Sequence, residues 1–118
     1  MPIFKIQHPM LEDENISYGF FTRNGGFSKK PFNTLNCSLN INDEETNVQK
    51  NLSLVSKELN LNSIIKLHQI HSSEVIIVDK NNSQNNFYKA DGLVTNLKNI
   101  GLSILGADCA PILFYDKV

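Results

Sequence analysis

The sequence lacks tryptophan and has only two cysteines and one arginine among its 118 residues. Its 11 basic and 12 acidic residues give a formal net charge of -1, so it has no concentrated positive charge for binding nucleic acid or an anionic membrane. It also lacks an apolar run near the length of about 20 residues that spans a bilayer, and its N-terminus lacks the layout of a signal peptide. We therefore expect a cytoplasmic protein without nucleic-acid or membrane partners.

The two cysteines, Cys37 and Cys109, lie far apart in the sequence. In a reducing compartment we expect both to be thiols, or one of them to be a metal ligand. Cys37 alternates with polar residues along 35–41 and is interpreted as a core residue. Cys109 follows Asp108 in the segment Gly-Ala-Asp-Cys-Ala-Pro at the end of an expected strand. A thiol beside a carboxylate at such a boundary favours a reactive or metal-binding site.

A length of 118 residues and a hydrophobic content of 41% fit one domain or part of one. A capping box at Thr46–Gln49 and the apolar stripe Val48, Leu52, Val55 and Leu59 predict a helix. Apolar alternation and short apolar runs predict strands over 16–21, 35–41, 63–71, 74–79, 93–95 and 102–105. The expected fold is α/β, a mixed sheet with packed helices. In the strand 63–71, His68 and His71 would point to opposite faces.

Six motifs then occur in a fixed order: Arg-Asn-Gly-Gly-Phe-Ser at 23–28, Leu-Asn at 35–36, Asp43, Gln-Ile-His at 69–71, Ala-Asp-Gly-Leu-Val-Thr at 90–95 and Ala-Asp-Cys-Ala-Pro at 107–111. Their order resembles the YfiH/laccase-domain family, also called multicopper polyphenol oxidoreductases and regarded as purine nucleoside phosphorylases. The resemblance implies a YfiH-like α/β fold, truncated here, with residues 1–118 as the N-terminal portion of a single domain.

The resemblance also implies a zinc ion held by two histidines and a cysteine. Two of these ligands, which are also the catalytic residues, fall on His71 and Cys109. The third belongs to a His-Ala-Gly-Trp-Arg-Gly segment that follows the cysteine motif in the family and that this sequence does not contain. Ser72 stands where the family usually has glycine, and Gly106 where it usually has threonine. The implied substrates are phosphate and the purine nucleosides adenosine, inosine and methylthioadenosine, and adenosine deamination is a further activity of the family.

Three residues are implied to bind substrate: Arg23, Ser28 and Asn36. Arg23 stands beside Gly25 and Gly26, so a guanidinium fork and exposed backbone amides can face an oxyanion such as phosphate. Its alternative role is structural, as the partner of a carboxylate or the cap of a turn. His71 likewise has a structural alternative, and His68 is interpreted as structural.

The chemistry of these residue types agrees with a zinc site, because zinc prefers thiolate and neutral imidazole, and a catalytic zinc keeps three protein ligands and one open position. We expect the His71 and Cys109 side chains to approach one another. We expect Asp108 to support Cys109 by accepting hydrogen bonds from backbone amides of its loop.

Two other functional hypotheses stay open. A copper-dependent polyphenol oxidase is the weaker one, because the sequence has no His-X-His pair of the kind that multicopper oxidases need. A non-catalytic fragment is the other, because the third metal ligand is missing and the sequence ends within an apolar pattern. In that case we expect exposed apolar surface and self-association through an unpaired strand edge.

Overall fold

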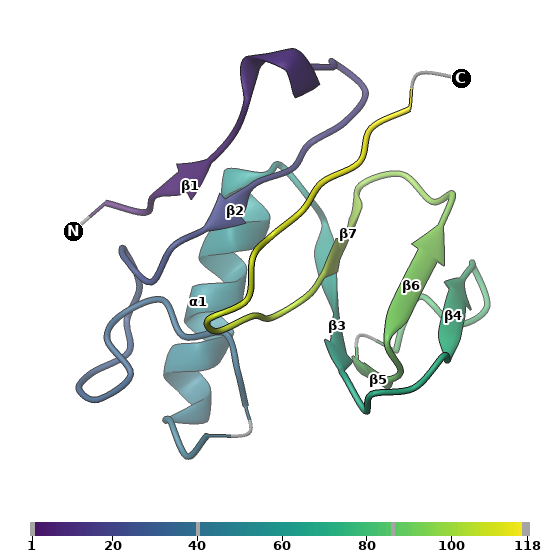
Figure 1. The fold of residues 1–118 in the computed structure, drawn as a ribbon. Helices are drawn as coiled ribbons and strands as arrows, with labels where there is room; N and C mark the ends of the chain where they lie inside the picture. The colour runs from purple at the N-terminus through teal and green to yellow at the C-terminus, as the bar shows by residue number, and fades with distance from the viewer. Residues whose placement is uncertain (1, 40, 86, 117–118) are drawn as a thin grey trace. The chain divides into compact units, whose positions relative to one another are not determined.

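The computed structural model describes residues 2–39, 41–85 and 87–116, and it divides the chain into two compact units. Unit 1 comprises Met1–Val55 and Gly106–Val118, and unit 2 comprises Ser56–Leu105. Figure 1 gives the order of their elements along the chain. The α/β fold expected from the sequence is confirmed.

Unit 1 contains a short antiparallel pair of strands, β1 (Lys5–Ile6) and β2 (Phe20–Phe21), which lie side by side in Figure 1. The 3-10 helix η1 (Pro9–Leu11) lies between them in the sequence. The strand predicted over 16–21 is therefore confirmed only at its end. Before β2, side-chain hydrogen bonds take the place of backbone pairing between strands. Gln7 donates through Nε2 to the Tyr18 carbonyl, and the Tyr18 hydroxyl accepts from the His8 amide.

The strand predicted over 35–41 is wrong, since the described residues 35–39 and 41 form no strand and residue 40 lies outside the described residues. The physical reason is asparagine chemistry. The Asn36 side chain accepts from the Ser38 amide at 3.0 Å and donates to the Ser38 carbonyl at 3.1 Å, so a local turn takes the backbone groups that a ladder would use. Cys37, interpreted above as a core residue, is half-buried.

The predicted helix is confirmed as α1 (Glu45–Glu58), which begins in unit 1. The predicted capping box is wrong, because Thr46 lies inside the first turn. The residue before the helix is Glu44, whose carbonyl accepts from the Val48 amide and whose carboxylate accepts from the Asn47 side chain. The buried face of α1 consists of Asn47, Val48, Asn51 and Val55.

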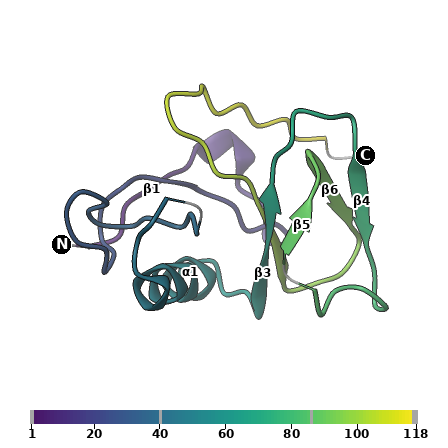
Figure 2. The same ribbon diagram turned by 90° about the horizontal axis from the view of Figure 1, so that it is seen from below.

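Unit 2 contains two parallel sheets, which can be followed in Figures 1 and 2. One sheet has the order β5-β3-β7, formed by β3 (Ser63–His68), β5 (Phe87–Lys89) and β7 (Ile100–Ser103). The other pairs β4 (Val75–Val78) with β6 (Gly92–Thr95). The chain crosses from the first sheet to the second twice, after β3 and after β5. The fully buried side chains include Ile65, Val78 and Ala90.

These strands confirm the predicted runs around 63–71, 74–79 and 93–95, while the last predicted strand is shifted toward the N-terminus, to Ile100–Ser103. β3 ends at His68, so the prediction that His71 continues the strand is wrong. His71 lies in the loop between β3 and β4.

One face of the β4–β6 sheet is apolar and exposed. Val75, Ile77 and Val94 alternate along the two strands and remain 56%, 69% and 54% exposed. In unit 1, Ile112 and Phe114 are also exposed. The expected apolar surface is thus present, and self-association through it stays a prediction.

Candidate functional site

His71 lies in a loop whose backbone is gathered around one carboxylate. Asp91, on the connection between β5 and β6, accepts through Oδ1 from the amides of Ile70 and His71 at 3.1 and 3.0 Å. Its Oδ2 accepts from the Ser72 amide at 2.8 Å and from the Ser72 hydroxyl at 2.6 Å. These hydrogen bonds, led by the one from the Ser72 hydroxyl, lower the pKa of Asp91 below its ordinary value of 3.8.

The backbone of His71 has a φ of 56°, in the left-handed region. This conformation costs a residue with a side chain about 1–2 kcal/mol, so the surrounding hydrogen bonds must stabilise it. The imidazole itself is exposed. The loop therefore combines a fixed backbone with an accessible side chain.

Cys109 is an exposed thiol in unit 1. Asp108 precedes it with a φ of 64°, so the backbone turns sharply at this point. The Asp108 carboxylate accepts no hydrogen bond from any described residue, and its expected role in supporting Cys109 stays a prediction. Farther along, the Tyr115 hydroxyl donates to the Asp13 carboxylate and fastens this segment within unit 1.

Arg23 is exposed and donates through Nε to the Asn33 carbonyl at 3.2 Å. Its two terminal nitrogens make no hydrogen bond with the described residues. The adjacent glycines differ from the expectation. The amides of Gly25 and Gly26 donate to the Thr34 hydroxyl at 3.0 and 3.2 Å, so the prediction that they are exposed to an oxyanion is wrong.

The two glycines are required by close backbone approach. A Cβ on Gly25 would lie 2.3 Å from the Ile3 Cα, and one on Gly26 would lie 2.3 Å from the Thr34 carbonyl oxygen. Gly25 also has a φ of 97°. The turn after Arg23 is thus a packed structural turn, and the terminal nitrogens of Arg23 make no hydrogen bond with the described residues.

Ser28 and Asn36 belong to a buried polar network centred on Asn51 of α1. Asn51 has no exposed surface, and its Nδ2 donates to the Ser28 hydroxyl at 2.9 Å and to the Asn36 carbonyl at 2.7 Å. Asp43 accepts through Oδ2 from Ser28 at 2.6 Å and from the Asn36 side chain at 2.9 Å. These hydrogen bonds, first that from Asn36, lower the pKa of Asp43. The polar atoms proposed to meet substrate are engaged within unit 1.

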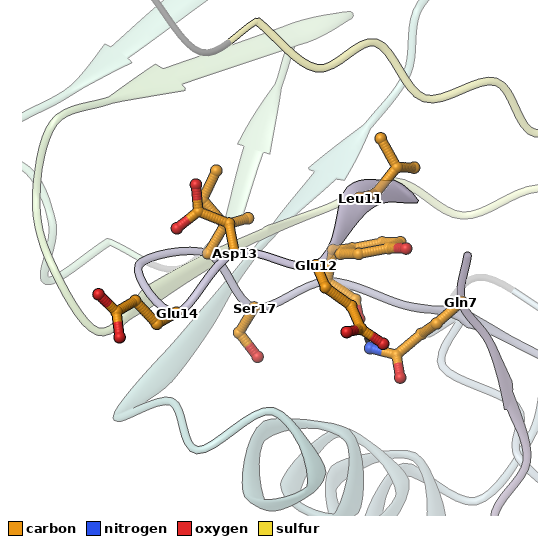
Figure 3. Close-up of a pocket in the computed structure, with 8 residues that line it drawn as sticks. Gln7, Leu11, Glu12, Asp13, Glu14 and Ser17 are labelled. Atoms are coloured by element: carbon orange, nitrogen blue, oxygen red, sulfur yellow. Dashed lines mark hydrogen bonds between the residues drawn. The ribbon is translucent and has the colours of Figure 1, made fainter. Parts of the chain in front are cut away.

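A hollow of about 410 Å³ lies in unit 1, away from these residues. Figure 3 shows the acidic side chains along its wall. The residues that line it are Gln7, Leu11, Glu12, Asp13, Glu14, Ile16, Ser17 and Tyr18. None of them is a predicted site residue, and the three carboxylates disfavour phosphate.

A metal needs more ligands than any one place in the described residues supplies. Imidazole and thiolate, the donors of His71 and Cys109, are the donor types that zinc prefers. However, the described residues contain no group of three or more His, Cys, Asp or Glu side chains arranged to hold a metal. His71 and Cys109 lie in different units, so their expected approach stays a prediction. The donors fit zinc in kind but not in number.

Asp91 and Asn51 are functional residues to which the sequence motifs assign no role. Asp91 stands in the recognised Ala-Asp-Gly motif, but its partners precede it by about twenty residues. The position of Asn51 is nevertheless visible in the sequence, because it falls between Val48 and Val55 on the apolar face of the helix. A polar residue at such a position indicates a buried hydrogen-bond network.

Comparison with known proteins supports the motif assignment. A sequence profile described as "Multi-copper polyphenol oxidoreductase laccase" matches residues 17–118. Purine nucleoside phosphorylase YlmD of Bacillus subtilis is 36% identical over 115 residues, which cover 90% of this chain and 41% of that protein. Purine nucleoside phosphorylase LACC1 of Mus musculus is 34% identical over 121 residues, covering 96% and 26%.

The fold has counterparts among solved structures. The crystal structure of the Neisseria meningitidis protein NMB0706 matches with a TM-score of 0.74 and 25% identity, covering 92% of this chain and 43% of that one. YlmD from Geobacillus stearothermophilus matches with a TM-score of 0.62 and 27% identity, covering 71% and 34%. The chain thus spans about two fifths of the length of the B. subtilis relative. Among the described residues, no helix has the length and apolarity that crossing a membrane requires.

Proposed function

The chain belongs to the multi-copper polyphenol oxidoreductase laccase family, and from this premise we propose that it forms part of a zinc-dependent purine nucleoside phosphorylase. The observation that carries the proposal is the name shared by relatives that are more than 30% identical across most of this chain. The proposed substrates are phosphate and a purine nucleoside such as adenosine, inosine or methylthioadenosine. Adenosine deamination is a second proposed activity of the same site.

In this proposal His71 and Cys109 are the catalytic residues of this chain and its two zinc ligands. An exposed imidazole on a fixed loop and an exposed thiol are both accessible to a metal ion. Zinc with an open coordination position supplies Lewis acidity and lowers the pKa of bound water. A complete site needs a third ligand from outside the described residues.

Arg23 is proposed to bind phosphate. Its Nε is held by the Asn33 carbonyl, and its terminal nitrogens remain available for a bidentate contact with an oxyanion. Ser28 and Asn36 are proposed to act indirectly, since both donate to the Asp43 carboxylate and both accept from Asn51, so they hold together the segments that follow the turn of Arg23. A copper-dependent polyphenol oxidase is the alternative that the family description names, but the relatives' names favour phosphorolysis.

The test measures turnover in a protein that contains this chain. The chain is assayed alone and joined to the part of the B. subtilis relative that lies beyond the matched segment. Adenosine and phosphate are supplied, and adenine, ribose 1-phosphate and bound zinc are measured. We expect phosphate-dependent release of adenine by the joined protein, with loss of activity in His71→Ala and Cys109→Ser.

Each variant has a matched control in the same chain. Cys37→Ser tests a second cysteine, and His8→Ala tests a second exposed histidine; both should retain turnover. Equal activity in His71→Ala and His8→Ala would remove His71 from the site. Adenine release without phosphate would indicate hydrolysis, and copper-dependent phenol oxidation would favour the alternative.

A further inference from the structure

Asp91 links the two segments of unit 2 that lead from the β5-β3-β7 sheet to the β4–β6 sheet, called here the two crossings. The loop after β3 and the connection after β5 both leave the β5-β3-β7 sheet for the β4–β6 sheet. Besides the four hydrogen bonds to its carboxylate, Asp91 donates its own amide to the Glu74 carbonyl at 3.0 Å. Asp91 is therefore held by its backbone while its side chain holds the neighbouring crossing.

The three amides that converge on Asp91 come from the consecutive residues 70–72. Successive amides around a left-handed residue form a nest that binds an anion. Here the anion is a side chain of the same chain, and the left-handed residue in the middle is His71. The Ser72 hydroxyl closes the arrangement, because it donates to Asp91 and accepts from the Glu74 amide at 3.1 Å.

The identity of the left-handed residue is informative. The other described residues with side chains and positive φ are Asn42, Asn60, Asn99 and Asp108. Asparagine and aspartate tolerate this conformation because their short side chains hydrogen-bond locally. His71 is the exception among them, and a glycine would adopt the same backbone without strain. The strain is therefore consistent with a need for the imidazole at this position.

We propose that Asp91 is the positioning residue of His71, holding residues 70–72 so that the exposed imidazole keeps one orientation for zinc. This inference rests on the proposed function, because it takes His71 as a metal ligand. Asp91 itself does not touch metal or substrate in this role. A purely structural cross-link between the two crossings is the competing explanation, and it predicts lower stability without a change in zinc affinity at His71.

The experiment is a zinc titration of the joined protein described under the proposed function, followed by the NMR signals of the His71 imidazole. In Asp91→Asn we expect the dissociation constant for zinc at His71 to rise by about 10-fold or more, the lower end of what loss of a supporting partner costs a metal site. Faster hydrogen exchange at the amides of 70–72 in the metal-free variant should accompany the change.

The matched control is Asp79→Asn, because Asp79 is also in unit 2 and accepts through Oδ1 from the amides of Asn81 and Asn82 at 2.8 and 3.2 Å. It should leave zinc affinity at His71 within about twofold of the wild type, since it lies outside the loop that carries the ligand. Affinity is read only where the amide spectrum shows unit 2 folded, so unfolding cannot imitate weaker binding.

Ser72→Ala is the second variant, which keeps the carboxylate and removes one of its four hydrogen bonds. It should weaken zinc binding by about threefold, less than Asp91→Asn. If the wild-type His71 imidazole does not respond to zinc, the metal site and this inference are both overturned. If it responds equally in wild type and in whichever variants fold, only the positioning role is overturned.

Discussion

Replacement of Asn51 by alanine should destabilise unit 1 far more than the same change at Asn47 one turn earlier. Asn51 is fully buried and uses both ends of its amide. Its Oδ1 accepts from the Phe27 amide at 2.7 Å, and its Nδ2 donates to three acceptors, the weakest being the Thr34 carbonyl at 3.3 Å. The asparagine therefore joins α1 to residues 27–28, which follow the Gly25-Gly26 turn, and to residues 34–36.

The size of the destabilisation depends on which partners of Asn51 lose their only hydrogen bond. The Ser28 hydroxyl still donates to Asp43, and the Thr34 carbonyl still accepts from the Ser28 amide at 2.8 Å. The Phe27 amide and the Asn36 carbonyl lose their bond to Asn51 without another described partner. Each unsatisfied group costs about 1–3 kcal/mol, so the loss of these two hydrogen bonds in Asn51→Ala should cost about 2–6 kcal/mol. That is a large share of the roughly 5–15 kcal/mol that stabilises a domain.

The assay is urea unfolding of both variants, followed by circular dichroism. Asn47 is also buried, but its side chain makes one hydrogen bond, of 3.3 Å, to the Glu44 carboxylate. Asn47→Ala should cost less than about 1 kcal/mol. Equal losses in the two variants, or a loss below about 1 kcal/mol for Asn51→Ala, would refute the assignment of Asn51 as the centre of the network.

The helix and the parallel strands could be predicted because their information is local. Val48 and Val55 repeat at helical spacing, and 63–68 and 75–78 are short apolar runs bounded by polar residues. The segment 35–41 has the same alternation as a strand, but Asn36 supplies backbone partners from its own side chain. Alternation reports which residues are apolar and not which hydrogen bonds the backbone forms.

The candidate site shows the same division. The motifs identified His71 and Cys109 from residue type and order. The hydrogen bonds of Asp91 depend on bringing together two crossings that are about twenty residues apart, and no local pattern contains that pairing. The glycines after Arg23 are typical of an anion-binding turn. Their amides are instead satisfied by Thr34, which the fold brings there from nine residues away.

Three further predictions concern unit 1. Gly26→Ala should lower the urea midpoint, because its Cβ would meet the Thr34 carbonyl oxygen, whereas Gly106→Ala, whose Cβ would have its nearest neighbour at 4.0 Å, should cost much less. The pKa of Asp43 is lower in the folded state than its ordinary value of 3.8, so its hydrogen bonds stabilise the folded state fully above pH 3.8. This stabilisation is lost as the pH falls from 3.8 through the folded-state pKa. In Asp43→Asn the free energy of unfolding should therefore depend less on pH in this acidic range. Arg23→Lys should raise the KM for phosphate in the joined protein with little change in kcat, because lysine has neither the Nε that donates to Asn33 nor a planar fork for an oxyanion. An unchanged KM, together with a lower urea midpoint, would show that Arg23 serves only to hold the turn.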